Sequence, residues 1–217
     1  MGSMAHGQPR HGSRRRRVAL RLGLVAAMAL PLAAVRLIPA VAGEHTPVWP
    51  GGVVRIYDES GMDATVRTAA ARWSESGAKV YLEVVDRPQR ADVIIKVDDR
   101  RLLRLCGHDC LGYSTSIGRP DDGRTTILLR SSLGGPVRPL SVWVAAHELG
   151  HVIGLQHHKG SRCSVMSPHA FDTRCAPALT SGSATAPELA CVPAPIDVAA
   201  AIALYGGKQA ARDPRCQ

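Results

Sequence analysis

Hydrophobic and polar positions alternate along the chain with two different periods from about residue 50 onward. Short apolar runs bounded by Gly, Pro, Asp and Ser predict five strands, at Val53–Tyr57, Lys79–Val85, Ala91–Val97, Leu111–Ile117 and Thr125–Leu129. Apolar residues spaced three or four apart predict amphipathic helices at Asp63–Ser76 and Ser141–Leu155. Elements in this order predict one α+β domain, in which a mixed sheet carries two helices above a cleft and a smaller C-terminal part lies below it.

The chain after the second predicted helix has a different composition. The segment Ser161–Pro195 is rich in Ser, Thr, Pro, Gly and Cys, which predicts an irregular, disulfide-held connection. The last residues, Lys208–Gln217, are expected to form a tail that is held in place only if Cys216 is paired.

The first 42 residues differ from the rest of the chain. A cluster of arginines between Arg10 and Arg17 precedes the apolar run Leu22–Val35, and the small residues Ala40–Ala42 follow. This order predicts a secretory signal, cleaved before Gly43, and therefore a secreted protein. The alternative is an uncleaved anchor that keeps the protein attached to the membrane and facing outside, but the run of about 14 apolar residues is shorter than the roughly 20 that span a bilayer.

The formal net charge of +9 would suit a nucleic-acid-binding protein, but its distribution argues against that function. Seven arginines and no acidic residue lie in the first 42 residues, so the predicted mature chain carries a formal charge of only +2. Aromatic residues make up 4% of the chain, too few for a platform on which single-stranded bases stack. We therefore expect no nucleic-acid partner.

All the cysteines follow the predicted cleavage site, and their number is even, which predicts three disulfides in an exported chain. Cys106 and Cys110 are expected to close a small loop. The alternative, a cysteine metal site, would need a second close pair at ligand spacing, and the sequence has none. The other four, Cys163, Cys175, Cys191 and Cys216, can pair in three ways, and the sequence does not choose among them.

Three histidines and a glutamate occur together between His147 and His157. Residues four apart share a face of a helix, so His147 and His151 can present ring nitrogens to one metal ion. Gly154 has no Cβ and can take a left-handed conformation, which would end the helix and let His157 return to the same ion. Three protein ligands would leave the fourth position of a tetrahedral zinc ion open to water, as a catalytic site requires.

The acidic residue beside the first histidine completes this chemistry. Zinc lowers the pKa of a bound water toward about 7, and Glu148 is placed to accept the proton as that water attacks a peptide carbonyl. The same residue would then carry the proton to the leaving amine. A structural helix with two unremarkable histidines is disfavoured, because the pattern also fixes Gly154 and His157 and is followed by Met166. The pattern predicts a zinc endopeptidase.

The segment Cys163–Pro168 is similar to the Met-turn that follows this motif in metzincins. Together with the histidine motif and a late helix at Pro193–Gly206, it makes residues 49–207 resemble the catalytic domain of a matrixin-like metzincin peptidase of the compact secreted bacterial type. The resemblance implies a catalytic domain over residues 43–207, with one helix in its C-terminal subdomain. It also implies that the three histidines hold one catalytic zinc, that Glu148 is the general base and that Met166 lies under the metal.

The resemblance further implies a binding mode for a protein or peptide substrate. Pro168 would line the pocket that receives the side chain after the scissile bond. Gly112, Tyr113 and Ser114 would lie at the sheet edge, where an extended peptide adds as an extra strand. We expect a monomer, with a membrane contact only through an uncleaved N-terminal segment.

Several features depart from the matrixin pattern or remain open. His158 stands where matrixins usually carry Ser or Thr, and the chain has neither a cysteine-switch propeptide nor the loop that holds a second, structural zinc. Asp98 and Asp99, at the end of a predicted strand, could help to bind calcium, although no oxygen-ligand loop of known spacing surrounds them. His158 and His169 could contact substrate or be solvated.

Two other functions use the same scaffold. One is a non-catalytic exported binding protein, and the other is a zinc amidase that acts on cell-wall peptides. A binding protein would have no need of Glu148, so the sequence favours the secreted zinc endopeptidase.

Overall fold

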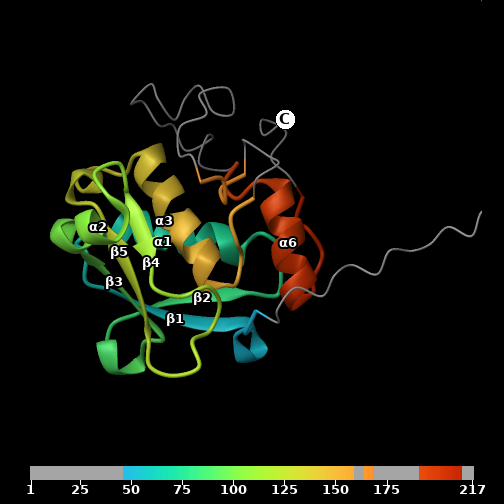
Figure 1. Ribbon diagram of the computed structural model, residues 1–217. Helices are drawn as coiled ribbons and strands as arrows, with labels where there is room; N and C mark the ends of the chain where they lie inside the picture. Colours follow the sequence, from blue (N-terminus) through green and yellow to red (C-terminus); the bar gives the residue numbers. More distant parts are fainter. Residues whose placement is uncertain (1–45, 159–163, 169–190, 212–217) are drawn as a thin grey trace, which may run out of the picture. The chain divides into compact units, whose positions relative to one another are not determined.

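The computed structural model describes residues 46–158, 164–168 and 191–211 of the 217-residue chain. Its strands are β1 Val53–Asp58, β2 Tyr81–Val85, β3 Val93–Val97, β4 Gly112–Ser114 and β5 Thr125–Leu129. They form one sheet in the order β2-β1-β3-β5-β4 (Figure 1). The first four strands in this order are parallel, and β4 pairs with β5 in the antiparallel sense. The predicted mixed sheet is confirmed, and β4 is an edge strand.

Four α-helices occur within the described ranges: α1 Asp63–Ser74, α2 Asp99–Cys106, α3 Pro139–Val152 and α6 Pro195–Tyr205. α1 and α3 pack against each other on one face of the sheet (Figure 1). Between them Trp73 is fully buried, and its Nε1 donates a hydrogen bond to the Ala146 carbonyl at 2.9 Å. The sheet contributes Ile56, Ile95 and Ile127 to the same core. This packing fixes α3 above the sheet.

Helix α3 differs from its predicted bounds at both ends. It begins at Pro139, because a proline's fixed φ and missing N–H suit the first turn of a helix. It ends at Val152, and Gly154 follows with φ +98°, in the left-handed region. The predicted role of Gly154 in ending this helix is confirmed.

The sequence interpretation missed α2, because it placed Asp98 and Asp99 at the end of a strand. Asp98 caps the helix by accepting a hydrogen bond from the Arg101 N–H at 2.9 Å. Asp99 accepts from the Ser131 N–H at 2.8 Å and from the Ser131 hydroxyl at 2.5 Å. These carboxylates cap a helix and hold a loop, and within the described ranges they belong to no group of three or more possible metal ligands.

The start of the predicted tail is bonded to the loop after α1. Lys208 donates its N–H to the Gly77 carbonyl at 3.0 Å, and Ala210 donates to Ser76 at 2.9 Å. The prediction that the tail depends on Cys216 alone is therefore wrong for these residues. Backbone hydrogen bonds to the loop hold these residues independently of the pairing of Cys216.

The predicted disulfide between Cys106 and Cys110 is confirmed. Cys191 is also disulfide-bonded, and the pairing of Cys163, Cys175 and Cys216 lies outside the described residues. So does the predicted signal or anchor, residues 1–42. Among the helices of the described part, none has both the length and the apolar character needed to cross a membrane.

Candidate metal centre

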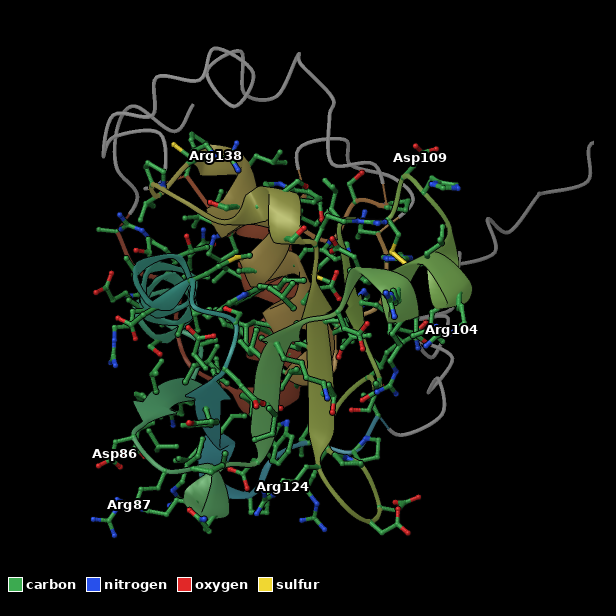
Figure 2. The ribbon with its side chains drawn as sticks, turned by 90° about the vertical axis from the view of Figure 1, so that its left-hand side faces the viewer. Asp86, Arg87, Arg104, Asp109, Arg124 and Arg138 are labelled. Carbon is green, nitrogen blue, oxygen red and sulfur yellow. A yellow bond between two sulfur atoms is a disulfide. The ribbon has the colours of Figure 1, made fainter. Side chains whose placement is uncertain are left out.

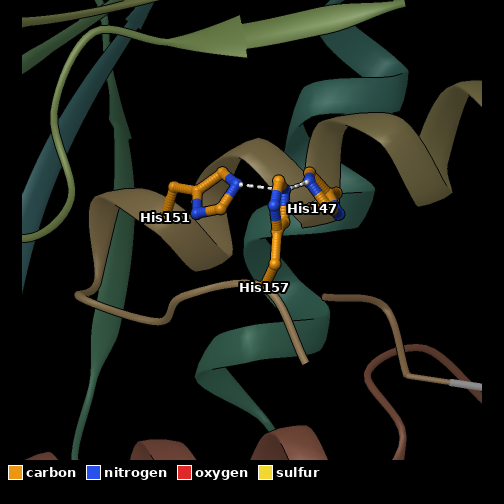
Figure 3. A group of neighbouring side chains, drawn as sticks. All are labelled: His147, His151 and His157. Carbon is orange, nitrogen blue, oxygen red and sulfur yellow. Dashed lines mark hydrogen bonds between the residues drawn. The ribbon is translucent and has the colours of Figure 1, made fainter. Parts of the chain in front are cut away.

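The three predicted histidines converge on one point (Figure 3). His147 and His151 lie one turn apart on α3, and His157 comes from the loop after Gly154. Nε2 of His157 lies 3.2 Å from Nε2 of His147 and 3.2 Å from Nε2 of His151. Two nitrogens bound at about 2.0–2.1 Å to a tetrahedral metal are about 3.3 Å apart. The histidines can therefore hold one metal ion with little movement.

Two backbone carbonyls orient the rings of the helical histidines. Nδ1 of His147 lies 2.6 Å from the Val165 carbonyl oxygen, and Nδ1 of His151 lies 2.8 Å from that of Leu155. A carbonyl can only accept, so each Nδ1 carries the proton and each Nε2 keeps its lone pair. The lone pairs of both rings therefore point toward the ring of His157, as metal ligation requires.

Burial keeps these rings neutral. It lowers the pKa of His147 to about 3, with a further contribution from repulsion by His151, and it also lowers the pKa of His151. Hydrogen bonds to the two carbonyls oppose these shifts. Because metals bind the neutral ring, binding near neutral pH needs no proton to be removed from either residue.

Trp143, which the sequence interpretation missed, supports the first ligand. Its ring stacks on that of His147, with 5.2 Å between centroids and 24° between planes. The signal was available, because Trp143 precedes His147 by four residues and so shares its helix face. The stacked ring restricts rotation of the imidazole.

Met166 is buried directly beneath α3. A Cβ added to Gly150 would lie only 2.2 Å from the Met166 sulfur and 3.3 Å from the Trp73 ring. The helix therefore needs a glycine at position 150 to let Met166 approach. The Met166 carbonyl also accepts from the His158 N–H at 2.9 Å.

The turn that carries Met166 is held by Asp197 of α6, a residue that the sequence did not indicate. The buried Asp197 carboxylate accepts from the N–H groups of Val165 at 2.8 Å and Ala194 at 2.9 Å, and from the Ser164 hydroxyl. Burial raises the pKa of Asp197, and these hydrogen bonds oppose the rise. A chain of hydrogen bonds thus runs from Asp197 through Val165 to His147.

The Glu148 carboxyl is buried between α3 and β4. A Cβ added to Gly112 would lie 2.6 Å from its Oε1, and the Ser114 N–H donates a hydrogen bond to it. Burial raises the pKa of Glu148 to about 8, and the bond from Ser114 opposes this rise. Glu148, which follows His147 directly in the chain, is therefore an acid whose pKa is raised to about 8.

A cleft of about 1360 Å³ opens over these residues. The histidines, Glu148, Gln156, the segment 111–117, Trp143 and Pro168 line it. The predicted substrate residues Gly112, Tyr113, Ser114 and Pro168 thus lie in the same cleft as the histidines. Met166 lies below the helix instead, and His169 is outside the described residues. The loop that contains His108 and Asp109 also reaches the cleft, which the sequence did not predict.

The peptide groups of β4 are arranged to bind an additional strand. The Arg130 N–H donates to the Leu111 carbonyl at 2.9 Å, and the Thr115 N–H donates to Thr126 at 3.0 Å. Residues in an antiparallel strand alternate in direction, so the peptide groups of Gly112 and Ser114 point away from β5. The edge of the sheet therefore presents the N–H and carbonyl of Gly112 and the carbonyl of Ser114, while the Ser114 N–H is bonded to the Glu148 carboxyl.

No protein-family model matches the chain, and no curated protein matches it. Among solved structures, the chain is similar to one described as the structure of myroilysin, with 17% sequence identity and a TM-score of 0.38. The match covers 52% of this chain and 53% of the other, so this chain spans about half the length of that neighbour. A likeness this partial assigns neither a fold family nor an activity.

Proposed function

We propose that the protein is a secreted zinc-dependent endopeptidase of the matrixin-like metzincin type. The observation that carries the proposal is the convergence of three imidazole Nε2 atoms beside the buried Glu148 carboxyl. Three imidazoles that converge on one point suit zinc, and a set of three leaves a position open for chemistry. The disulfide between Cys106 and Cys110 agrees with an oxidising environment.

Zinc bound by these histidines would supply Lewis acidity, polarising a peptide carbonyl and lowering the pKa of water toward about 7. Glu148 would accept a proton from that water and later donate it to the leaving amine. A pKa near neutrality serves both roles, because the group must gain and lose the same proton in one cycle. Val165, Leu155 and Trp143 would hold the ligand rings in place.

The sheet edge would hold the substrate main chain. An extended peptide antiparallel to β4 can bond to the outward N–H and carbonyl of Gly112 and to the outward carbonyl of Ser114. Backbone bonds of this kind position a peptide with little dependence on its sequence. They would place a carbonyl beside Glu148, since the Glu148 carboxyl already lies against these two residues.

A binding protein on the same scaffold is the weaker proposal. Burial of an unpaired carboxyl costs stability, and burial raises the pKa of Glu148 to about 8. A protein without a catalytic role for Glu148 would gain by replacing it. A zinc amidase that acts on cell-wall peptides would use the same residues, so only its substrates would distinguish it from the endopeptidase.

The test combines zinc analysis with digestion of a proteome-derived peptide library. The parent should hold about one zinc per chain and cut internal peptide bonds, whereas His157→Ala should lose zinc affinity by orders of magnitude and activity with it. Glu148→Gln should keep its zinc but lose turnover by about 10²–10⁴. Asp122→Asn, in an exposed turn away from the cleft, is the control. Near-parental hydrolysis by zinc-loaded Glu148→Gln would refute the mechanism, and cleavage confined to cell-wall peptides would favour the amidase.

Export is tested separately. Mature protein recovered from culture medium should begin within a few residues of Gly43. Intact Met1 on protein extracted from membranes would support the anchor instead.

A further inference from the structure

The loop closed by the Cys106–Cys110 disulfide is fixed from below by Arg130. The Arg130 guanidinium donates to the Cys110 carbonyl at 2.6 and 3.0 Å, and to the carbonyls of Gly107 and His108 at 3.1 Å each. Three carbonyls of the loop therefore face one cation, and a covalent bond closes the loop. The disulfide and the hydrogen bonds from Arg130 together make this loop a rigid element.

Residues of this loop line the cleft. Both His108 and Asp109 line it, and Asp109 is exposed. In Figure 2 Asp109 lies at the end of this loop, away from the disulfide and well separated in that view from Arg104 and Arg138. Within the described part of the chain, no ion pair involves Asp109, and no Lys or Arg lines the cleft. The Asp109 carboxylate thus lies at the cleft without an ion-pair partner among the described residues, and the Arg130 guanidinium below the loop is directed at backbone carbonyls.

The direction of β4 decides which part of a substrate meets this charge. Glu148 lies against Gly112 and Ser114, so the scissile bond belongs near them. In a peptide antiparallel to β4, residues after the scissile bond run back toward Leu111 and the disulfide loop. Each residue advances the chain by about 3.4 Å, so the loop is reached about two to four residues beyond the scissile bond.

We propose that Asp109 makes the enzyme prefer peptides with Lys or Arg two to four residues after the scissile bond. This inference rests on the proposed peptidase function and deepens it by naming a substrate class. An exposed ion pair is weak, so the expected preference over a neutral residue is about two- to fivefold in kcat/KM. Because solvent ions screen such a pair, the preference should shrink as salt is added.

The test uses peptides that differ only by Lys, Gln or Glu at each of these positions. The parent should cut the Lys peptides fastest and the Glu peptides slowest. Asp109→Asn should remove the difference, and Asp109→Lys should reverse it, whereas Asp122→Asn should behave as the parent. A Lys preference that persists unchanged in both Asp109 variants would overturn the proposal.

A binding measurement separates this proposal from the peptidase proposal. Labelled Lys, Gln and Glu peptides are titrated into the zinc-loaded Glu148→Gln protein, with and without Asp109→Asn, and followed by fluorescence anisotropy. Charge-dependent binding that needs Asp109 supports the assignment even if the parent hydrolyses no peptide, a result that would refute only the peptidase. Binding that ignores peptide charge overturns the assignment, whatever the hydrolysis result.

Discussion

Val165 connects two parts of the site, because its carbonyl accepts from Nδ1 of His147 at 2.6 Å while its N–H is held by Asp197 at 2.8 Å. The two bonds lie on opposite sides of one residue, so a movement of Asp197 moves the carbonyl that orients the ligand. Asp197 touches no ligand atom and no cleft surface among the described residues. It is a positioning residue that acts through the turn.

Replacing Asp197 by Asn should weaken metal binding without removing a ligand. The amide keeps one acceptor oxygen but turns an NH₂ toward groups that themselves donate, so the turn and the Val165 carbonyl should shift. Loss of such a supporting contact costs about 10- to 100-fold in metal affinity. Chelator competition measures the affinity. Asp92→Asn, which also alters a carboxylate bonded to a backbone N–H but on the sheet, is the matched control.

A purely structural role for Asp197 predicts a different result. Thermal unfolding of the metal-free Asp197→Asn protein would then show lower stability, while the zinc dissociation constant measured well below the transition would equal that of the parent.

Gly150→Ala should destabilise the protein although alanine is the better helix former. The propensity gain is at most about 1 kcal/mol, whereas overpacking a filled core costs about 1–3 kcal/mol. The new methyl group would meet the Met166 sulfur at 2.2 Å, and Trp73 closes the other side. Urea unfolding should show a net loss of about 1–2 kcal/mol. In a Met166→Ala background the same change should cost less, and an equal cost in both backgrounds would show that Met166 is not the obstacle.

The sequence was sufficient where local spacing determines geometry. His147 and His151 follow from the helix period, and Gly154 from the need for a left-handed residue before His157. The sheet edge at Gly112 was also anticipated, although β4 spans only Gly112–Ser114, with one further hydrogen bond to the β5 side at each end, at Leu111 and Thr115.

The sequence was insufficient where contacts join distant segments. Asp197 meets Val165 across more than thirty residues, and no periodicity links them. Helix α2 was missed because it follows β3 directly, so that its capping residue Asp98 resembled the polar end of a strand. The loop that carries Asp109 is held by Arg130, which directly follows β5, the second strand after the loop.

Gly112→Ala should impair turnover while leaving the metal in place. The added methyl group would lie 2.6 Å from Oε1 of Glu148 and 2.8 Å from its Cγ, so the carboxyl must move. The histidines are not contacted, and zinc content should remain about one per chain. Displacing a general base should lower kcat by about tenfold or more. In a Glu148→Gln background the same substitution should have little further effect on kcat, and a full additional loss there would mean that Gly112 acts through something other than Glu148.

The stability of the metal-free protein should depend on pH through Glu148. Its pKa is about 8 in the folded protein against a usual value of 4.5, so between these values the folded state holds a proton that the unfolded state has released. Stability must therefore fall as pH rises from about 4.5 to 8. Glu148→Gln removes this dependence. The variant should match the parent near pH 5 and exceed it near pH 8, by on the order of a few kcal/mol.

The measurement is urea unfolding of both metal-free proteins at several pH values between 5 and 8. The contribution of His147 to stability has the opposite pH dependence. Its pKa is lowered to about 3, so this contribution is lost as pH falls from 6.5 toward 3. That contribution is common to both proteins and cancels in their difference. A difference between variant and parent that stays constant over this range would show that the Glu148 carboxyl is not held protonated by burial.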